Sequence, residues 1–275
     1  MQRFLLIFLL NLAHVYAVET LPAPQKMGDF PKEIPESSGV VKSPKHAGVY
    51  WTHNDSGNKP ELLAIDGNGK LLAKLPVLNA ENTDWEDIAL DEQDRIILAD
   101  IGDNFAKRTE CRLYRVAEPD PTQKDPVDKV QVFRFVYPQK AAVDAESLIV
   151  RAGFAYVFTK EKKRTRVFRI PVPDQPPADV QTAELVAETE QSIYLTAADL
   201  SPDGKFLALL SYGLITVIEL PDVFEKTGTP FPKPFEGKKR VRLIFIGQAE
   251  GIAWDGNDLV LTTEGGSIWR MTGAK

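Results

Sequence analysis

A short phrase that recurs five times along the chain is the feature that most constrains its fold. In each copy the first residue carries a side-chain oxygen, and the copies begin at Ser38, Glu86, Glu146, Thr196 and Glu250. Successive copies are separated by 48, 60, 50 and 54 residues. A period near 50 residues is typical of β-propellers, in which small sheets surround a central channel. The sequence therefore predicts an all-β protein, a five-bladed β-propeller.

The remainder of each repeat is typical of further strands, because apolar residues alternate with polar ones and β-branched and aromatic residues are frequent. Second strands are predicted at 48–51, 94–99, 154–158, 205–210 and 258–261, and third strands at 61–66, 112–116, 166–170, 214–219 and 267–271. Fourth, outer strands are predicted at 130–136 and 240–245, and the proline-rich stretches 118–127, 171–177 and 221–234 are interpreted as loops inside blades.

The segment Met27–Pro35 precedes the first phrase and has no blade of its own. A propeller whose last blade takes a strand from the opposite end of the chain closes its ring and removes exposed sheet edges. We therefore expect this segment to supply the outer strand of the last blade.

The first 17 residues are typical of a secretory signal peptide. The chain begins Met-Gln-Arg, continues through the apolar run Phe4–Leu10 and reaches a small residue at Ala17. The run is shorter than the roughly 20 apolar residues that span a bilayer. We expect cleavage after Ala17, export to the periplasm or the extracellular medium, and a single propeller domain over residues 18–275.

Composition excludes several classes of partner. The net charge of −6 argues against a protein that binds nucleic-acid polymers, which would present a basic surface. No later segment is apolar enough to span a membrane. Cys111 is the single cysteine, so the chain forms no internal disulfide bond.

Equivalent residues of successive blades face the same axis, so the five phrase residues should form a ring around the channel. Glutamate, serine and threonine offer hard oxygen ligands, which suit Ca²⁺, whereas Zn²⁺ prefers nitrogen and sulfur. The sequence predicts a calcium site formed by Ser38, Glu86, Glu146, Thr196 and Glu250. In the alternative interpretation, the glutamates accept backbone N–H bonds from neighbouring blades and water fills the channel.

The order Ser, Glu, Glu, Thr, Glu resembles that of the calcium-activated nucleotidases, a family of secreted apyrases with five-bladed propellers. In that family the blades carry Ser, Glu, Glu, Ser and Glu around a central calcium, so Thr196 replaces a serine here. The resemblance covers the whole ring through one residue per blade. It implies hydrolysis of phosphate anhydrides, although Asn54-Asp55 supplies only half of the acidic pair found after the first blade's second strand in the family.

A looser similarity links the chain to uncharacterised exported bacterial propellers described as esterase-like or phytase-associated. It rests on the phrases His53–Gly57, Asp84–Ile88, Asp100–Asn104 and Asp144–Glu146. A propeller hosts many functions, so this similarity implies little about chemistry.

The loops between second and third strands are expected at the same end as the phrase residues, around the mouth of the channel. Their acids are candidate catalytic residues: Asp55, Asp100, Asp103 and Glu264. Their other polar residues are candidates for binding an anionic substrate: His53, Asn54, Lys160, Arg164 and Tyr212. Cations would hold the anion while an acid and a calcium ion orient water for attack. We expect Asp55 or Asp100 to activate the water, and Lys160 and Arg164 to hold phosphate oxygens.

Two functions remain open at this point. One is a calcium-dependent hydrolase of phosphate anhydrides or esters, and the other is a non-catalytic propeller that binds a small anionic ligand, a glycan or a protein on the same face. The chain shows no Ser–His–Asp or zinc-hydrolase motif that would demand catalysis. In the alternative interpretation, Asp55-Ser56-Gly57 only forms a turn, and the charged run 161–164 is a solvated hairpin tip.

Overall fold

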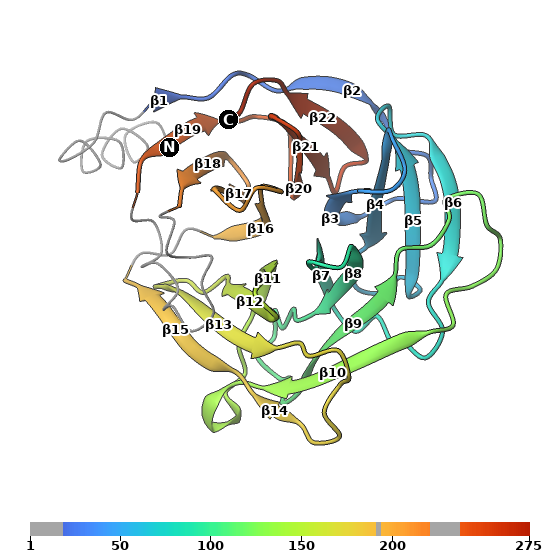
Figure 1. Ribbon diagram of the computed structural model, residues 1–275. Coiled ribbons are helices and arrows are strands. Elements are labelled where there is room, and N and C mark those ends of the chain that lie inside the picture. The colour runs from blue at the N-terminus through green and yellow to red at the C-terminus, as the bar shows by residue number, and fades with distance from the viewer. Residues whose placement is uncertain (1–18, 191–193, 221–236) are drawn as a thin grey trace.

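The computed structural model describes residues 19–190, 194–220 and 237–275, which form five small sheets arranged in a ring (Figure 1). The predicted signal peptide and the proline-rich stretch 221–234 lie outside the described residues. Within the described residues the helical content is one 3₁₀ turn, η1 (Pro138–Lys140). No helix among them is long and apolar enough to cross a membrane.

Each sheet is one blade, and the prediction of five blades is confirmed. Blade 1 contains β3 (Ser37–Lys42), β4 (Val49–Asn54), β5 (Glu61–Asp66) and β6 (Leu71–Pro76). Blade 2 contains β7 (Trp85–Leu90), β8 (Arg95–Asp100), β9 (Cys111–Ala117), β10 (Val130–Val136) and β14 (Gln181–Thr182). Blade 3 contains β11 (Ala145–Arg151), β12 (Phe154–Thr159), β13 (Thr165–Pro171) and β15 (Glu184–Thr189).

Blades 4 and 5 complete the ring. Blade 4 contains β16 (Leu195–Leu200), β17 (Phe206–Ser211), β18 (Leu214–Glu219), β19 (Lys239–Leu243) and β1 (Glu19–Thr20). Blade 5 contains β20 (Ala249–Asp255), β21 (Asp258–Thr263), β22 (Ser267–Met271) and β2 (Gln25–Asp29). The first strands β3, β7, β11, β16 and β20 lie innermost and contact one another around the channel (Figure 1).

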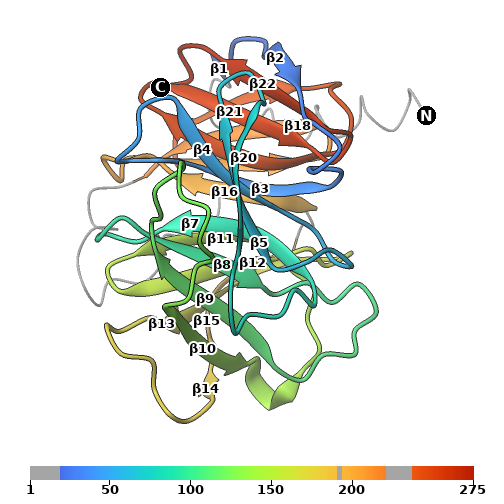
Figure 2. The ribbon, with the colours of Figure 1, turned by 90° about the vertical axis from the view of Figure 1, so that its right-hand side faces the viewer.

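The N-terminal segment closes the ring as predicted, although its strand begins slightly earlier. β2 pairs antiparallel with β22, with Gln25 opposite Arg270 and Asp29 opposite Ser267. Both views place β2 at the rim of the ring beside the last strand (Figure 2). β1 and β14 add short parallel pairings to blades 4 and 2, which the sequence did not predict because two-residue strands show no periodicity.

The hydrophobic core lies between the blades, in five clusters that each join two neighbouring sheets. Trp51 and Trp85 pack between blades 1 and 2, and Phe135 packs with Phe168 between blades 2 and 3. All four side chains are fully buried. Burying apolar surface on both faces of every sheet makes each blade depend on its neighbours, so the ring is stable only as a unit.

A polar network adds to the contact between blades 5 and 1. Tyr50 Oη donates to Asp255 Oδ2 at 2.6 Å, and the Arg270 guanidinium donates to Asp255 at 2.6 Å and to Tyr50 Oη at 2.7 Å. Arg270 also pairs with Asp258 at 2.8 Å. A single guanidinium therefore joins three partners where the two ends of the ring meet.

Replacing Arg270 by methionine should destabilise the ring at this junction. The variant leaves Asp255 and Asp258 without their cation, so we expect a loss of about 1–3 kcal/mol in the free energy of unfolding. Denaturant unfolding of the purified protein measures it. Arg134→Met is the control, because Arg134 forms an exposed pair with Glu110, and exposed pairs contribute little to stability. Equal losses in the two variants would contradict the interpretation.

Candidate functional site

The inner strands share one irregularity near their start. The register between first and second strands shifts across Glu86, Glu146, Thr196 and Glu250 in blades 2 to 5. In blade 1 the shift falls at Gly39, one residue after Ser38. A β-bulge bends its strand and re-aims the local side chains. The recurring sequence phrase therefore marks an equivalent β-bulge in each blade, at the same end of the channel.

The three ring glutamates are buried near one another. Their exposed fractions are 4% for Glu86, 2% for Glu146 and 9% for Glu250. Burial, together with the neighbouring Glu146, raises the pKa of Glu86 well above its usual range. Burial also raises the pKa of Glu146 to about 8 and that of Glu250 to about 7. This end of the channel therefore favours protons or another cation on its carboxylates.

The two ring hydroxyls form hydrogen bonds between blades. Ser38 Oγ donates to the carbonyl of Glu86 at 2.8 Å, which joins β3 to β7. Thr196 Oγ1 donates to the carbonyl of Ala249 at 2.7 Å, which joins β16 to β20. Both side chains therefore hold neighbouring inner strands together, while their oxygen lone pairs remain able to coordinate an ion.

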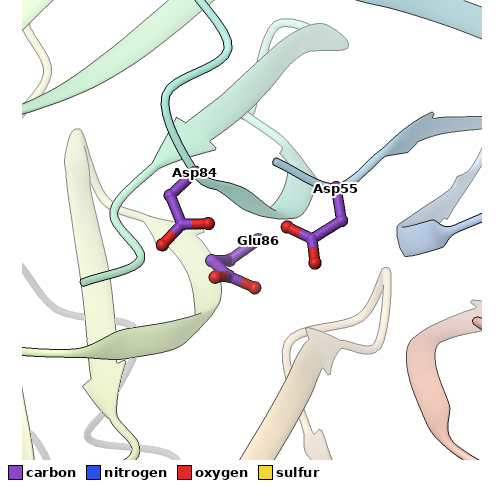
Figure 3. Close-up of side chains that lie close together, drawn as sticks. All are labelled: Asp55, Asp84 and Glu86. Atoms are coloured by element: carbon purple, nitrogen blue, oxygen red, sulfur yellow. The ribbon is translucent and has the colours of Figure 1, made fainter. Parts of the chain in front are cut away.

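Three carboxylates form what we term the acid cluster: Asp55, Asp84 and Glu86 (Figure 3). Asp55 follows β4, Asp84 precedes β7, and oxygen atoms of all three residues lie within 4.8 Å of one another. Two unit charges at that separation repel by about 3 kcal/mol at an effective dielectric constant of about 20. Burial and the neighbouring Asp55 raise the pKa of Asp84 to about 6. The cluster is therefore unfavourable when fully ionised unless a cation is bound.

Asn82 and the main chain hold the acid cluster together. The Asn82 side-chain amide donates to the carbonyls of Asn54 at 3.1 Å and Asp55 at 2.9 Å, and its oxygen accepts the N–H of Trp85 at 3.0 Å. This side chain therefore fastens the loop after β4 to the start of β7 across the boundary between blades 1 and 2. The positions of the carboxylates follow from these backbone contacts.

Gly102, in the loop between β8 and β9, approaches the acid cluster so closely that no side chain fits there. A Cβ atom at this position would lie 2.1 Å from Glu86 Oε1 and 2.5 Å from Asp84 Oδ2. Sequence reasoning did not include Gly102, Asp84 or Asp144 among the site residues. The available signal was the repeated Asp-x-Glu spacing in Asp84-Trp85-Glu86 and Asp144-Ala145-Glu146.

Lys160 follows β12 and lies against the ring. Its Nζ donates to both carboxylate oxygens of Glu146 at 2.5 Å and to Tyr212 Oη at 2.8 Å. Burial opposes the ammonium charge, but Glu146 outweighs it, so the pKa of Lys160 rises. Lys160, which was predicted to bind substrate, therefore contacts the predicted metal ligand Glu146 and a second predicted substrate-binding residue, Tyr212.

Asp100 and Asp103, both predicted as catalytic, accept structural hydrogen bonds. The buried Asp100 Oδ1 accepts from the N–H of Asp84 at 2.9 Å and from Arg108 at 3.0 Å. Asp103 accepts the backbone N–H groups of Lys107 at 2.8 Å and Arg108 at 2.9 Å. The two aspartates therefore shape the β8–β9 loop and hold Arg108, a cation that the sequence did not indicate.

The remaining predicted residues lie in different surroundings. His53 is 0% exposed, with its ring edge-on to Trp85 at 5.6 Å, and burial lowers its pKa to about 4. The buried Asn54 donates to the carbonyl of Glu33 at 3.1 Å, so neither residue offers surface to a ligand.

Arg164 pairs with Glu161 and Glu188 at the β12–β13 hairpin, each at 3.5 Å. Glu264 accepts from Gln248 and is close enough to raise the pKa of Glu250, after the larger effect of burial.

Comparison with known proteins returns similar structures at low identity. The PQQ-bound aldose sugar dehydrogenase of Streptomyces coelicolor is 12% identical with a TM-score of 0.49, covering 92% of this chain and 99% of that one. A chain of a nidogen/laminin complex is 10% identical with a TM-score of 0.41, covering 82% and 72%. Kuenenia stuttgartiensis hydrazine synthase is 14% identical with a TM-score of 0.40, covering 91% and 57%.

Similarities at this level carry no argument about function, so the blade count rests on the sheet topology of the chain itself. No protein-family model and no curated protein sequence matches the chain. The resemblance to the calcium-activated nucleotidases therefore rests on the ring residues alone.

Substituting Gly102 by alanine should disrupt the acid cluster. The added methyl group meets Glu86 and Asp84 well inside van der Waals distance, so the loop must move, at a cost of roughly 1–3 kcal/mol. Thermal unfolding measures that cost. Gly265→Ala is the matched control, because Gly265 lies in another loop of the same face with no atom nearer than 4.0 Å to its added Cβ. A Gly102 variant as stable as the control would show that the loop does not pack against the carboxylates.

Proposed function

We propose that this protein is an exported calcium-binding β-propeller that captures a small anionic ligand at the channel mouth. The observation that carries the proposal is the surroundings of Glu86. Its carboxylate is buried and has no hydrogen-bond or ion-pair partner among the described residues. The charged groups that act on it most strongly are all carboxylates: Glu146, Asp55, Asp84 and Asp144. A buried carboxylate among like charges remains ionised only with a cation beside it.

The acid cluster provides the most suitable ligands for that cation. Asp55, Asp84 and Glu86 supply hard oxygens, the donors that Ca²⁺ prefers, with no nitrogen or sulfur ligand among them. The sequence-based prediction placed the ion at the centre of all five ring residues. We propose instead a position nearer blades 1 and 2, because the three acids of the cluster come from those blades and Glu146 is paired with Lys160.

A bound calcium ion would supply the positive charge that attracts an anionic group to an otherwise acidic mouth. At the same place, Tyr212, which is 40% exposed, offers its hydroxyl and the Lys160 ammonium adds positive charge. A phosphorylated or carboxylated small molecule suits this combination. A glycan or a protein would be recognised by surface contacts, so a ligand screen with and without calcium separates these classes.

Hydrolysis of phosphate anhydrides or esters is the second candidate function. The observation in its favour is the position of Asp55, a partly exposed carboxylate within the acid cluster. Such a group can accept a proton from an attacking water while Lys160 and Tyr212 orient the anion. Asp100, the other predicted water activator, is buried and engaged with Arg108, so it is the weaker candidate.

Calcium should stabilise the protein strongly at pH 8 and weakly at pH 5. Without the ion, the pKa of Asp84 is raised to about 6 and that of Glu86 well above its usual range. The folded state then holds protons that the unfolded state releases, so their stabilising contribution is present below about pH 4 and is lost as the pH rises through 6 and above. Calcium replaces those protons and contributes about 2.7 kcal/mol at 100 times its dissociation constant.

The measurement is the melting temperature with chelator and with excess calcium at several pH values. At pH 8 we expect a shift on the order of 5–10 °C for a domain of this size. A calcium effect that is absent, or equal at pH 5 and pH 8, contradicts the proposal.

Asp84→Asn should weaken calcium binding by at least about tenfold, because it removes one charged ligand. Asp94→Asn, which changes an exposed aspartate in the turn between β7 and β8, is the control. Calorimetric titration with CaCl₂ measures both variants.

Incubation with a panel of nucleotides and phosphate esters, with calcium and then with chelator, tests catalysis. If the calcium-loaded protein hydrolyses none of these compounds, the hydrolase function is ruled out.

A further inference from the structure

The carboxylates of the acidic mouth differ in charge balance. The Lys160 ammonium contacts both oxygens of Glu146, and the pair is nearly enclosed, with side-chain exposures of 14% and 3%. The acid cluster forms no ion pair with a cation in the part of the chain that the structure describes. Among the described residues, Lys160 is the one cation that forms an ion pair with a ring glutamate.

The main chain fixes the position of Lys160. Its N–H donates to the carbonyl of Asp144 at 3.0 Å, and the preceding residue, Thr159, pairs with Ala145. Glu146, the bulged residue of β11, follows directly. The Tyr212 hydroxyl accepts from the ammonium at 2.8 Å, and the Tyr212 ring centroid lies 4.9 Å from it. The ammonium is therefore held by contacts from blades 3 and 4, unlike a surface lysine that samples many rotamers.

A second cation near the mouth, Arg108, contacts other groups. Arg108 donates to Asp100 Oδ1 at 3.0 Å, to the carbonyl of Gly102 at 2.9 Å and to the carbonyl of Asp100 at 3.0 Å. These contacts hold the β8–β9 loop and leave the ring glutamates untouched. Lys160 is thus placed where a second metal ion would otherwise find Glu146 and Glu250, two buried carboxylates of the ring.

We propose that Lys160 is a built-in counter-ion that limits the mouth to one calcium ion, held at the acid cluster. This inference rests on the proposed calcium-binding function. An ammonium and a divalent cation compete for the same carboxylate oxygens, so the ion pair with Glu146 blocks a second ion. Removing the ammonium leaves Glu146 and Glu250 buried without a neighbouring positive charge, which creates a second oxygen-rich cation site.

The test is calorimetric titration of the mature protein with CaCl₂ at pH 7.5, compared with Lys160→Met. We expect one ion per wild-type chain and two per Lys160→Met chain. Lys160→Arg keeps the positive charge and should bind one ion. Lys162→Met removes a charge from an exposed position two residues away and should also bind one.

The possible results separate the inference from the function on which it rests. A wild-type protein that binds no calcium overturns both. A wild-type protein that binds one ion, with Lys160→Met also binding one at unchanged affinity, overturns the inference and leaves the proposed function standing.

The double variant Lys160→Met/Glu146→Gln keeps the test decisive if the single variant does not fold. It removes both charges of the pair, so position 146 is not left with a buried carboxylate that has lost its cation. We expect it to bind one ion with an affinity within about threefold of the wild type, because a neutral pair has been replaced by neutral side chains. A second bound ion in the double variant, or an affinity more than about tenfold weaker, contradicts the role assigned to Lys160.

Discussion

The carboxylate of Asp87 joins three of the five blades, and the arrangement of the mouth depends on it. Its Oδ1 accepts the N–H of Ile88 at 2.9 Å, and its Oδ2 accepts the N–H groups of Leu148 at 2.8 Å and Ala198 at 3.3 Å. A single fully buried side chain therefore links β7, β11 and β16. Gly39 of blade 1 leaves space for this carboxylate because it has no side chain: a Cβ atom there would lie 3.0 Å from Asp87 Oδ1. Because Asp87 directly follows Glu86, the contact that holds the inner strands together also fixes a residue of the acid cluster.

The mouth concentrates negative charge that the fold alone does not balance. Asp100 is compensated by Arg108, and Glu146 by Lys160. Glu86, Asp84 and Asp55 have no ion-pair partner among the described residues, and further carboxylates, Glu146 and Asp144, lie near them. Protons can supply the missing positive charge at low pH, and a divalent cation can supply it at neutral pH. The proposed function follows from this difference between balanced and unbalanced acids within one small region.

The repeats revealed the blades, the inner strands and the residues at the bulges, because each blade carries the same local pattern. The sequence could not reveal which polar groups neutralise one another. Lys160 was assigned to substrate phosphate, yet it contacts Glu146, whose carboxylate comes from the neighbouring strand of its own blade. Asp84 was overlooked because its role depends on Asp55, a residue from another blade. His53 was placed on the binding face because it was assigned to the loop between the second and third strands, but it belongs to β4 and packing against Trp85 encloses it. Such pairings depend on how the blades meet, which no local pattern encodes.

The pairing of β2 with β22 has a consequence for how the molecule assembles. Gln25 is synthesised early, and β2 can pair with β22 only after Arg270 has been synthesised, so blade 5 gains its outer strand late. Contacts between such distant segments form slowly, because a long loop must close first. Glu250 belongs to that last blade, so the charged opening of the channel is complete only once blade 5 has formed. A chain truncated before blade 5 would carry most of the sheets and lack a complete mouth.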